Sequence, residues 1–108
     1  QQLLWTLLSH LMSFENQLKE EMRLVLLRLL NEMPSYRGNS STLHGGLDRW
    51  GLSFSRDQVK TELYWLKDQG CLSIEMEDPA VLVVKLTERG QEVAENRTRI
   101  PGIKRPSA

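Results

Sequence analysis

The sequence predicts a mainly α-helical domain with one small antiparallel β-hairpin, in the order helix, helix, helix, strand, strand, helix. Two observations predict this class. Up to about residue 69, apolar residues recur every three or four positions, which is the spacing of one helix face. After Gly70 the spacing changes to two, and Asp78–Pro79 interrupts the alternation, which is typical of two strands joined by a turn.

Length and composition narrow the classes of protein. The chain has 108 residues, the length of one domain, and its 14 Lys and Arg balance its 14 Asp and Glu. We therefore expect no bulk attraction to nucleic acid or membrane. A single cysteine, Cys71, excludes an internal disulfide and predicts a reducing compartment, the cytoplasm. We divide the chain into a helical extension at 1–12, a domain at 13–97 and a flexible basic tail at 98–108.

The first helix is predicted from Phe14 to Met33. Apolar residues repeat on one face of this segment, and Pro34 disfavours helical geometry in the residue before it. The residues before Phe14 are rich in leucine but too few to span a membrane. Two interpretations stay open: either Ser13 caps a fresh helix, or residues 3–33 form one long helix.

A single long helix would place apolar side chains in rows seven residues apart, with Glu15 as the one break. Such a seam is longer than a small domain can cover, so a second copy of the chain is the expected cover. The sequence then predicts a homodimer through this helix. The residues predicted at the dimer interface are Leu4, Leu8, Leu11, Leu18 and Met22.

The second helix is predicted to begin in the Asn39–Ser41 cluster, where a side-chain oxygen can accept a first-turn amide. Its apolar stripe is Leu43, Leu47 and Trp50, and Gly51 ends it. The adjacent Gly45 and Gly46 lower the helix propensity, so packing has to stabilise this segment.

The third helix has the clearest start signal, with Ser55 as the N-cap and Gln58 three residues later for a capping box. Gly70 follows its end, where a left-handed residue commonly closes a helix. Its predicted core stripe is Val59, Leu63 and Leu66.

The hairpin and the last helix complete the domain. Leu72 to Met76 alternate as a half-buried strand, and Val81 to Leu86 form the return strand. Thr87 is predicted to cap a helix that runs to about Arg97, with Gly90 as a small contact point in it.

Two stretches carry a resemblance to known proteins. Residues 47–66, a short helix, a glycine-containing turn and a well-capped helix, resemble a helix-turn-helix. Residues 84–94, VKLTERGQEVA, are similar to the segment that follows the wing in bacterial winged-helix regulators. Over residues 14–97 the order of elements resembles the winged helix-turn-helix superfamily, and the whole chain resembles small winged-helix proteins of Mu-like phages and prophages. This resemblance implies a DNA-binding protein in the bacterial cytoplasm, a regulator or an accessory to phage DNA handling.

In such proteins the third helix enters the major groove, and a flexible basic tail can follow the phosphates. One flank of the third helix is basic, although three acidic residues on the same helix balance it. The hairpin tip from Glu75 to Asp78 carries three acids and no base, which is unfavourable beside phosphates. The residues predicted to contact double-stranded DNA are Arg56, Lys60, Thr61, Tyr64, Lys67, Arg97, Arg99, Lys104 and Arg105.

An alternative stays open, a winged-helix module for protein association that uses the acidic wing and Trp65. Trp65 lies off the core stripe of its helix, so it is either covered by a neighbouring element or exposed at an interface. No segment offers a nucleophile with a base, so we expect no enzyme. His10, His44 and Cys71 lie far apart in sequence, so neither a metal nor a cofactor is predicted.

Overall fold

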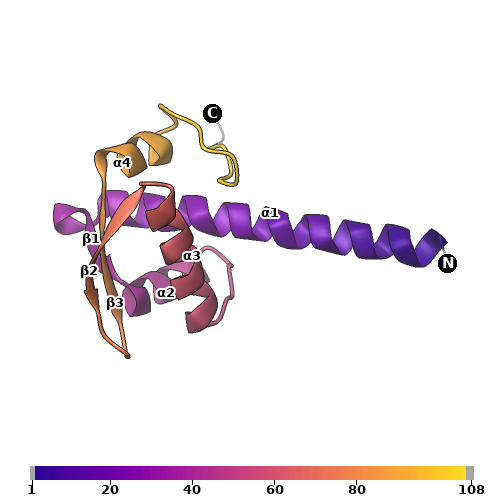
Figure 1. The fold of residues 1–108 in the computed structure, drawn as a ribbon, viewed down its shortest axis with the longest axis horizontal. Helices are drawn as coiled ribbons and strands as arrows, with labels where there is room; N and C mark the ends of the chain where they lie inside the picture. The colour runs from indigo at the N-terminus through magenta and orange to yellow at the C-terminus, as the bar shows by residue number, and fades with distance from the viewer. Residues whose placement is uncertain (1, 107–108) are drawn as a thin grey trace.

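The computed structural model describes residues 2–106, and Figure 1 shows its helices and strands. In chain order the elements are α1 (Gln2–Glu32), a short 3-10 helix (Pro34–Tyr36), β1 (Arg37–Asn39), α2 (Ser40–Arg49), α3 (Arg56–Asp68), β2 (Leu72–Glu77), β3 (Leu82–Leu86) and α4 (Glu88–Ala94).

The three strands form one antiparallel sheet in the order β1-β3-β2. The predicted hairpin is β2–β3, whereas β1 was not predicted, because three residues with a central glycine show no alternation. Gly38 in β1 pairs with Val84, and a Cβ on Gly38 would lie 2.9 Å from the sulfur of Met33. The expected alternation fails at Met76, which is 49% exposed, because the register of β2 shifts between Ile74 and Met76.

The core lies between the sheet, the second half of α1, α2 and α3. The predicted stripe of α3 is fully buried, and so are Leu43 and Leu47 of α2. Trp50 was wrongly placed in that core: it is 61% exposed at the C-cap of α2, where the helix ends. Leu52, two residues later, is buried instead, and its amide donates to the Leu47 carbonyl.

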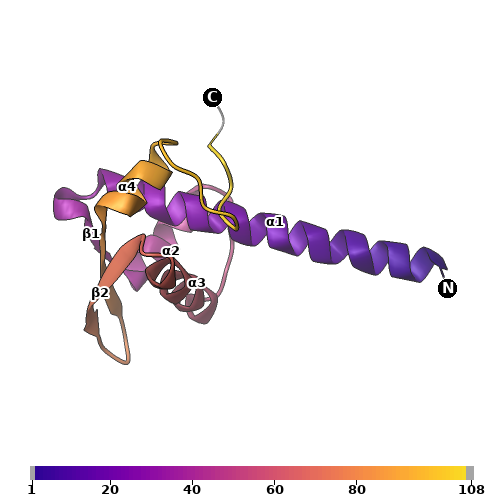
Figure 2. The ribbon, with the colours of Figure 1, turned by 45° about the horizontal axis from the view of Figure 1, so that its top comes forward.

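The first helix is one continuous element from Gln2 to Glu32, so the interpretation with a fresh helix at Ser13 is wrong. The segment contains no glycine or proline that would interrupt it. Its first half projects away from the rest of the molecule (Figures 1 and 2). Two of the predicted interface residues belong to this chain's own domain, since Met22 is buried in the core and Leu18 packs against it.

The predicted helix caps are confirmed. Ser55 accepts from the Gln58 amide at 3.1 Å, and the Gln58 side chain accepts from the Ser55 amide at 2.8 Å. Thr87 caps α4 through the Gly90 amide at 3.1 Å. This helix ends at Ala94, three residues before the predicted end.

The residues after α4 do not form a flexible arm as predicted. Ile100 and Ile103 are buried in the core, and the Lys104 amide donates to the Glu20 carbonyl of α1 at 3.1 Å. Figures 1 and 2 both show this segment beside α1. Two isoleucines three residues apart supply enough apolar surface to hold the chain against the domain. The last two residues of the predicted tail, Ser107 and Ala108, lie outside the described residues.

Candidate nucleic-acid interface

A buried ion pair fixes α3 relative to α1. The Arg23 Nε of α1 donates to Glu62 Oε1 of α3 at 2.6 Å, and both side chains are largely buried. The same guanidinium stacks on the Trp65 ring, 3.9 Å from its centroid, and donates from Nη1 to the Gly102 carbonyl at 2.8 Å. A Cβ on Gly102 would lie 2.8 Å from the Trp65 ring, so the segment after α4 also packs against Trp65. Trp65 is therefore covered, which confirms one of the two interpretations.

This ion pair changes the charge of the α3 surface. Glu62 is one of the three acids of α3 that were expected to balance its basic flank, but its carboxylate faces Arg23 inside the protein. On the exposed side of α3 the acids are Asp57 and Asp68. The hydrophobic periodicity of α1 places Arg23 on its polar side, so the sequence pattern could not predict that Arg23 pairs with a residue of another helix.

Two of the predicted α3 residues hold the hairpin instead of projecting freely. The Tyr64 hydroxyl donates to Glu77 Oε1 at 3.0 Å, and Lys60 Nζ donates to the Pro79 carbonyl at 3.3 Å. The hydrogen bond to the Glu77 carboxylate raises the pKa of Tyr64 above 10, with smaller contributions from desolvation and charge repulsion. Arg56, Thr61 and Lys67 are exposed along the same helix, and the Thr61 hydroxyl donates to the Asp57 carbonyl.

The acids of the hairpin tip have partners within the chain. Both Glu75 oxygens accept from the Arg37 guanidinium of β1, with Nη2 3.2 Å from Oε2. Glu77 accepts from Tyr64, and Asp78 Oδ1 accepts from the Ala80 amide at 2.8 Å. The repulsion expected between these acids and DNA phosphates is thus partly offset. The Arg37 guanidinium responsible comes from β1, the strand that the sequence pattern did not predict.

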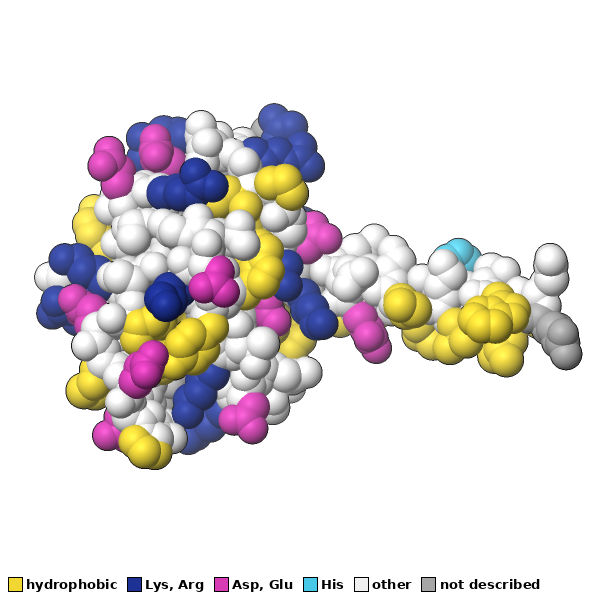
Figure 3. Space-filling model, in the orientation of Figure 1, with side chains coloured by type: hydrophobic (Ala, Val, Ile, Leu, Met, Phe, Trp, Pro, Cys, Tyr) yellow, Lys and Arg dark blue, Asp and Glu magenta, His cyan; other side chains and the backbone are white. Residues whose placement is uncertain are grey.

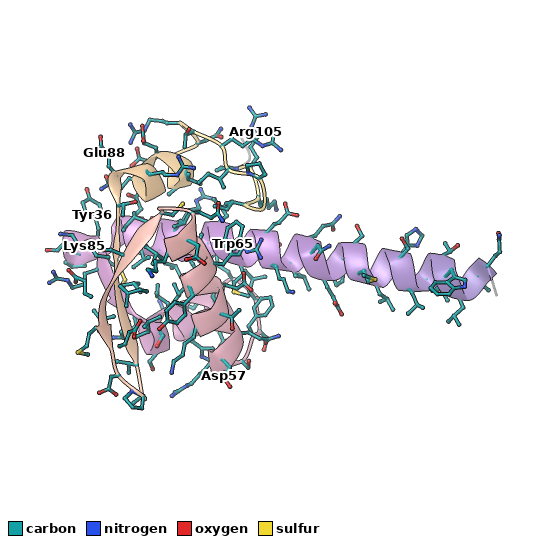
Figure 4. The ribbon with its side chains drawn as sticks, viewed as in Figure 1. Tyr36, Asp57, Trp65, Lys85, Glu88 and Arg105 are labelled. Carbon is teal, nitrogen blue, oxygen red and sulfur yellow. The ribbon has the colours of Figure 1, made fainter. Side chains whose placement is uncertain are left out.

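The predicted basic residues after α4 divide into two groups. Arg97 pairs with Glu95 at 2.9 Å, and Lys104 Nζ lies 3.8 Å from Glu21. Arg99 and Arg105 are exposed, and within residues 2–106 their side chains make neither a hydrogen bond nor an ion pair. Figure 4 shows Asp57 at the lower end of α3 and Arg105 at the upper side of the molecule.

The predicted residues of α3 lie along Arg56–Asp68, and the other predicted residues lie after α4. Figure 3 shows basic side chains interspersed with acidic ones over the globular part, without a continuous basic band. Among the described residues there is no group of three or more His, Cys, Asp or Glu that could hold a metal. No helix within residues 2–106 is long and apolar enough to cross a membrane.

The geometry describes a small helical domain with a three-stranded antiparallel sheet and an exposed helix face of mixed charge. Two known proteins are similar in sequence to this chain. The chain is 43% identical over 89 residues to the uncharacterized protein gp26 of Escherichia phage Mu, covering 82% of this chain and 91% of gp26. It is also 42% identical over 78 residues to an uncharacterized protein of Haemophilus influenzae, covering 72% of this chain and 76% of that protein.

The chain therefore belongs to the family of phage Mu gp26. The predicted kinship with proteins of Mu-like phages is confirmed. No protein-family model matches the chain, and no solved structure matches it.

Proposed function

We propose that this protein is a winged-helix DNA-binding protein of a phage or prophage, a regulator or an accessory to phage DNA handling. The observation that carries the proposal is the exposed face of α3, which presents Arg56, Thr61 and Lys67 to solvent. The buried face of the same helix is anchored to α1 by the Arg23–Glu62 ion pair. In this reading α2 and α3 form the helix-turn-helix and β2–β3 is the wing. Kinship with a phage protein supports the same proposal.

The roles within α3 follow from position along the helix. Residues at the N-terminal end of a recognition helix contact base edges, so Arg56 and Thr61 take that role. Lys67 in the last turn contacts a phosphate, and Arg99 and Arg105 extend the phosphate contacts beyond α3. Lys60 and Tyr64 position the wing against the recognition helix through their bonds to Pro79 and Glu77.

A duplex-binding titration tests this proposal. Binding of a fluorescent duplex of mixed sequence is followed by anisotropy at several salt concentrations. Replacing Arg56 and Lys67 together by alanine should weaken binding. The slope of log K against log salt should fall by about 1, since Lys67 is the one phosphate contact that this variant removes. Lys19→Gln removes a charge from an exposed position of α1 and is the matched control.

Two outcomes would contradict the proposal: no duplex binding by the wild-type protein at low salt, or an equal loss in the Lys19→Gln control. Truncating residues 98–108 is not a suitable variant, because it removes Ile100 and Ile103 from the core together with the basic side chains. Substitution of Arg99 and Arg105 by alanine tests those two charges without opening the core.

The alternative function, a module for protein association, loses one of its proposed contact residues. Trp65 packs against Arg23 and Gly102 and is partly buried, so it does not project freely as an interface residue. What favours association is a different feature, the exposed apolar first half of α1.

A further inference from the structure

The first half of α1 carries an apolar surface that this chain leaves uncovered. Figure 3 shows hydrophobic side chains along one side of the projecting helix. No residue from Gln2 to Phe14 is charged. With roughly 200 Å² for a large apolar side chain, the exposed fractions correspond to about 1,000 Å², more than the largest apolar patch of a typical monomer. The exposed side chains are Leu3, Leu4, Trp5, Leu7, Leu8, Leu11, Met12 and Phe14.

A groove on the globular part has matching properties. It has a volume of about 580 Å³ and lies between the end of α1 and α2, with Leu29, Met33 and Trp50 in its walls. Trp50 is the exposed tryptophan at the C-cap of α2. Gly45 leaves part of the groove wall without a side chain, and a Cβ on it would meet no atom within 4 Å, whereas Leu29 fills the space beside Gly46. A helix can therefore approach α2 closely at this point.

The groove cannot be filled by the same chain's own apolar segment. Because α1 is one straight helix, Leu8 and Leu29 are separated by 21 residues, or about 31 Å along the axis. Any occupant that resembles residues 3–14 must come from a second molecule.

The two features also lie on one side of α1. At about 100° per residue, Leu7, Leu11 and Leu18 lie within roughly 40° of Val25 and Leu29, which line the groove and its continuation along α1. A two-fold axis perpendicular to α1 and passing through this stripe would make two α1 helices antiparallel. The exposed first half of each α1 would then lie against the second half of the other, which borders the groove. Both grooves would then be filled by the same operation, which gives a closed dimer.

We propose that a second copy of this chain occupies the groove, with the two α1 helices antiparallel and crossing near residue 19. The first half of each α1 then lies between α1 and α2 of its partner. The apolar area exposed on the first half of α1, about 1,000 Å² summed over all its sides, is of the same order as the roughly 800 Å² per partner of a stable interface. The polar side of residues 2–14 carries no Lys or Arg, which distinguishes it from helices that bind anionic membranes. The proposal uses none of the residues assigned to DNA and stands independently of that function.

Oligomeric state tests the interface with matched variants. Light scattering of the full chain should give twice the 12.5 kDa of one molecule. Leu7→Glu with Leu11→Glu should give the single mass, whereas Ser9→Glu with Ser13→Glu, on the polar side, should leave the dimer intact. Gly45→Leu fills the groove and should raise the dimer dissociation constant at least tenfold, and Asp48→Leu on the same helix outside the groove should leave it unchanged.

Cysteine crosslinking tests the register. In the proposed dimer the two Leu8 positions are about 33 Å apart, so Leu8→Cys alone should give no disulfide-linked dimer. Leu8→Cys combined with Gly45→Cys should give one, and this bond cannot form within a single chain. The native Cys71 is buried and does not compete.

Three results would overturn the proposal. A disulfide with Leu8→Cys alone would show that the first halves of α1 pair directly with each other. A monomeric wild-type protein that binds anionic phospholipid vesicles would assign the apolar surface to a membrane. A monomeric protein that binds neither itself nor vesicles would leave the surface to a different protein.

Discussion

Replacing Ile103 by alanine should destabilise the protein strongly, although this residue lies only five positions from the end of the chain. Ile103 is 4% exposed, so the substitution removes three buried carbon groups. At about 0.8 kcal/mol for each group the transfer cost is roughly 2.4 kcal/mol, and the cavity left behind raises the loss to about 3 kcal/mol. With a urea dependence of about 1.5 kcal/mol per molar, the unfolding midpoint should fall by about 2 M.

Urea unfolding followed by tryptophan fluorescence measures this change, because Trp65 is covered by the adjacent Gly102. Arg105→Ala, at an exposed position two residues later, is the control and should shift the midpoint little. An Ile103→Ala midpoint within error of the wild type would refute the reasoning, since it would mean that the segment after α4 does not pack against the domain.

Three further predictions concern α3, the β2–β3 hairpin and α4. Gly90→Ala should destabilise the protein by about 1–3 kcal/mol or prevent folding, because its Cβ would lie 2.0 Å from the Cys71 carbonyl oxygen; thermal unfolding measures this. Ser55→Ala should cost about 1 kcal/mol in urea unfolding through loss of the capping box, and Ser55→Asp should restore most of it. Tyr64 should ionise above pH 10 in the native protein, and its contribution to stability should be full below pH 10 and lost as the pH rises through its raised pKa. Glu77→Gln should lower that pKa towards 10 in a tyrosinate absorbance titration, and an unchanged titration would exclude the hydrogen bond as the cause.

Local signals predicted most of the secondary structure correctly. The start of α3 was predictable because the side chains of Ser55 and Gln58 each accept a hydrogen bond from the other's backbone amide. The end of β3 was predictable because Thr87 caps the helix that follows. These are interactions between near neighbours in sequence. Trp50 was misplaced because the periodicity of α2 continues to the residue at which the helix ends.

Long-range contacts explain what the pattern missed. The strand β1 is defined by pairing with β3, more than forty residues away, and its own three residues show no alternation. The segment after α4 was expected to be a flexible arm because it is rich in basic residues and prolines. It packs against the domain through Ile100 and Ile103 and through the Gly102 carbonyl, which accepts from Arg23. For the candidate site, the same cause hid the pairing of Glu62 with Arg23 and of Glu75 with Arg37.

The most direct measurement of the proposed function is a map of backbone amide chemical shifts as a duplex is added to the isotope-labelled protein. We predict that the largest shifts fall on residues 56–67 of α3 and around Arg99 and Arg105, while the shifts of residues 2–14 of α1 stay unchanged. Shifts confined to the first half of α1, or none at all at low salt, would contradict it.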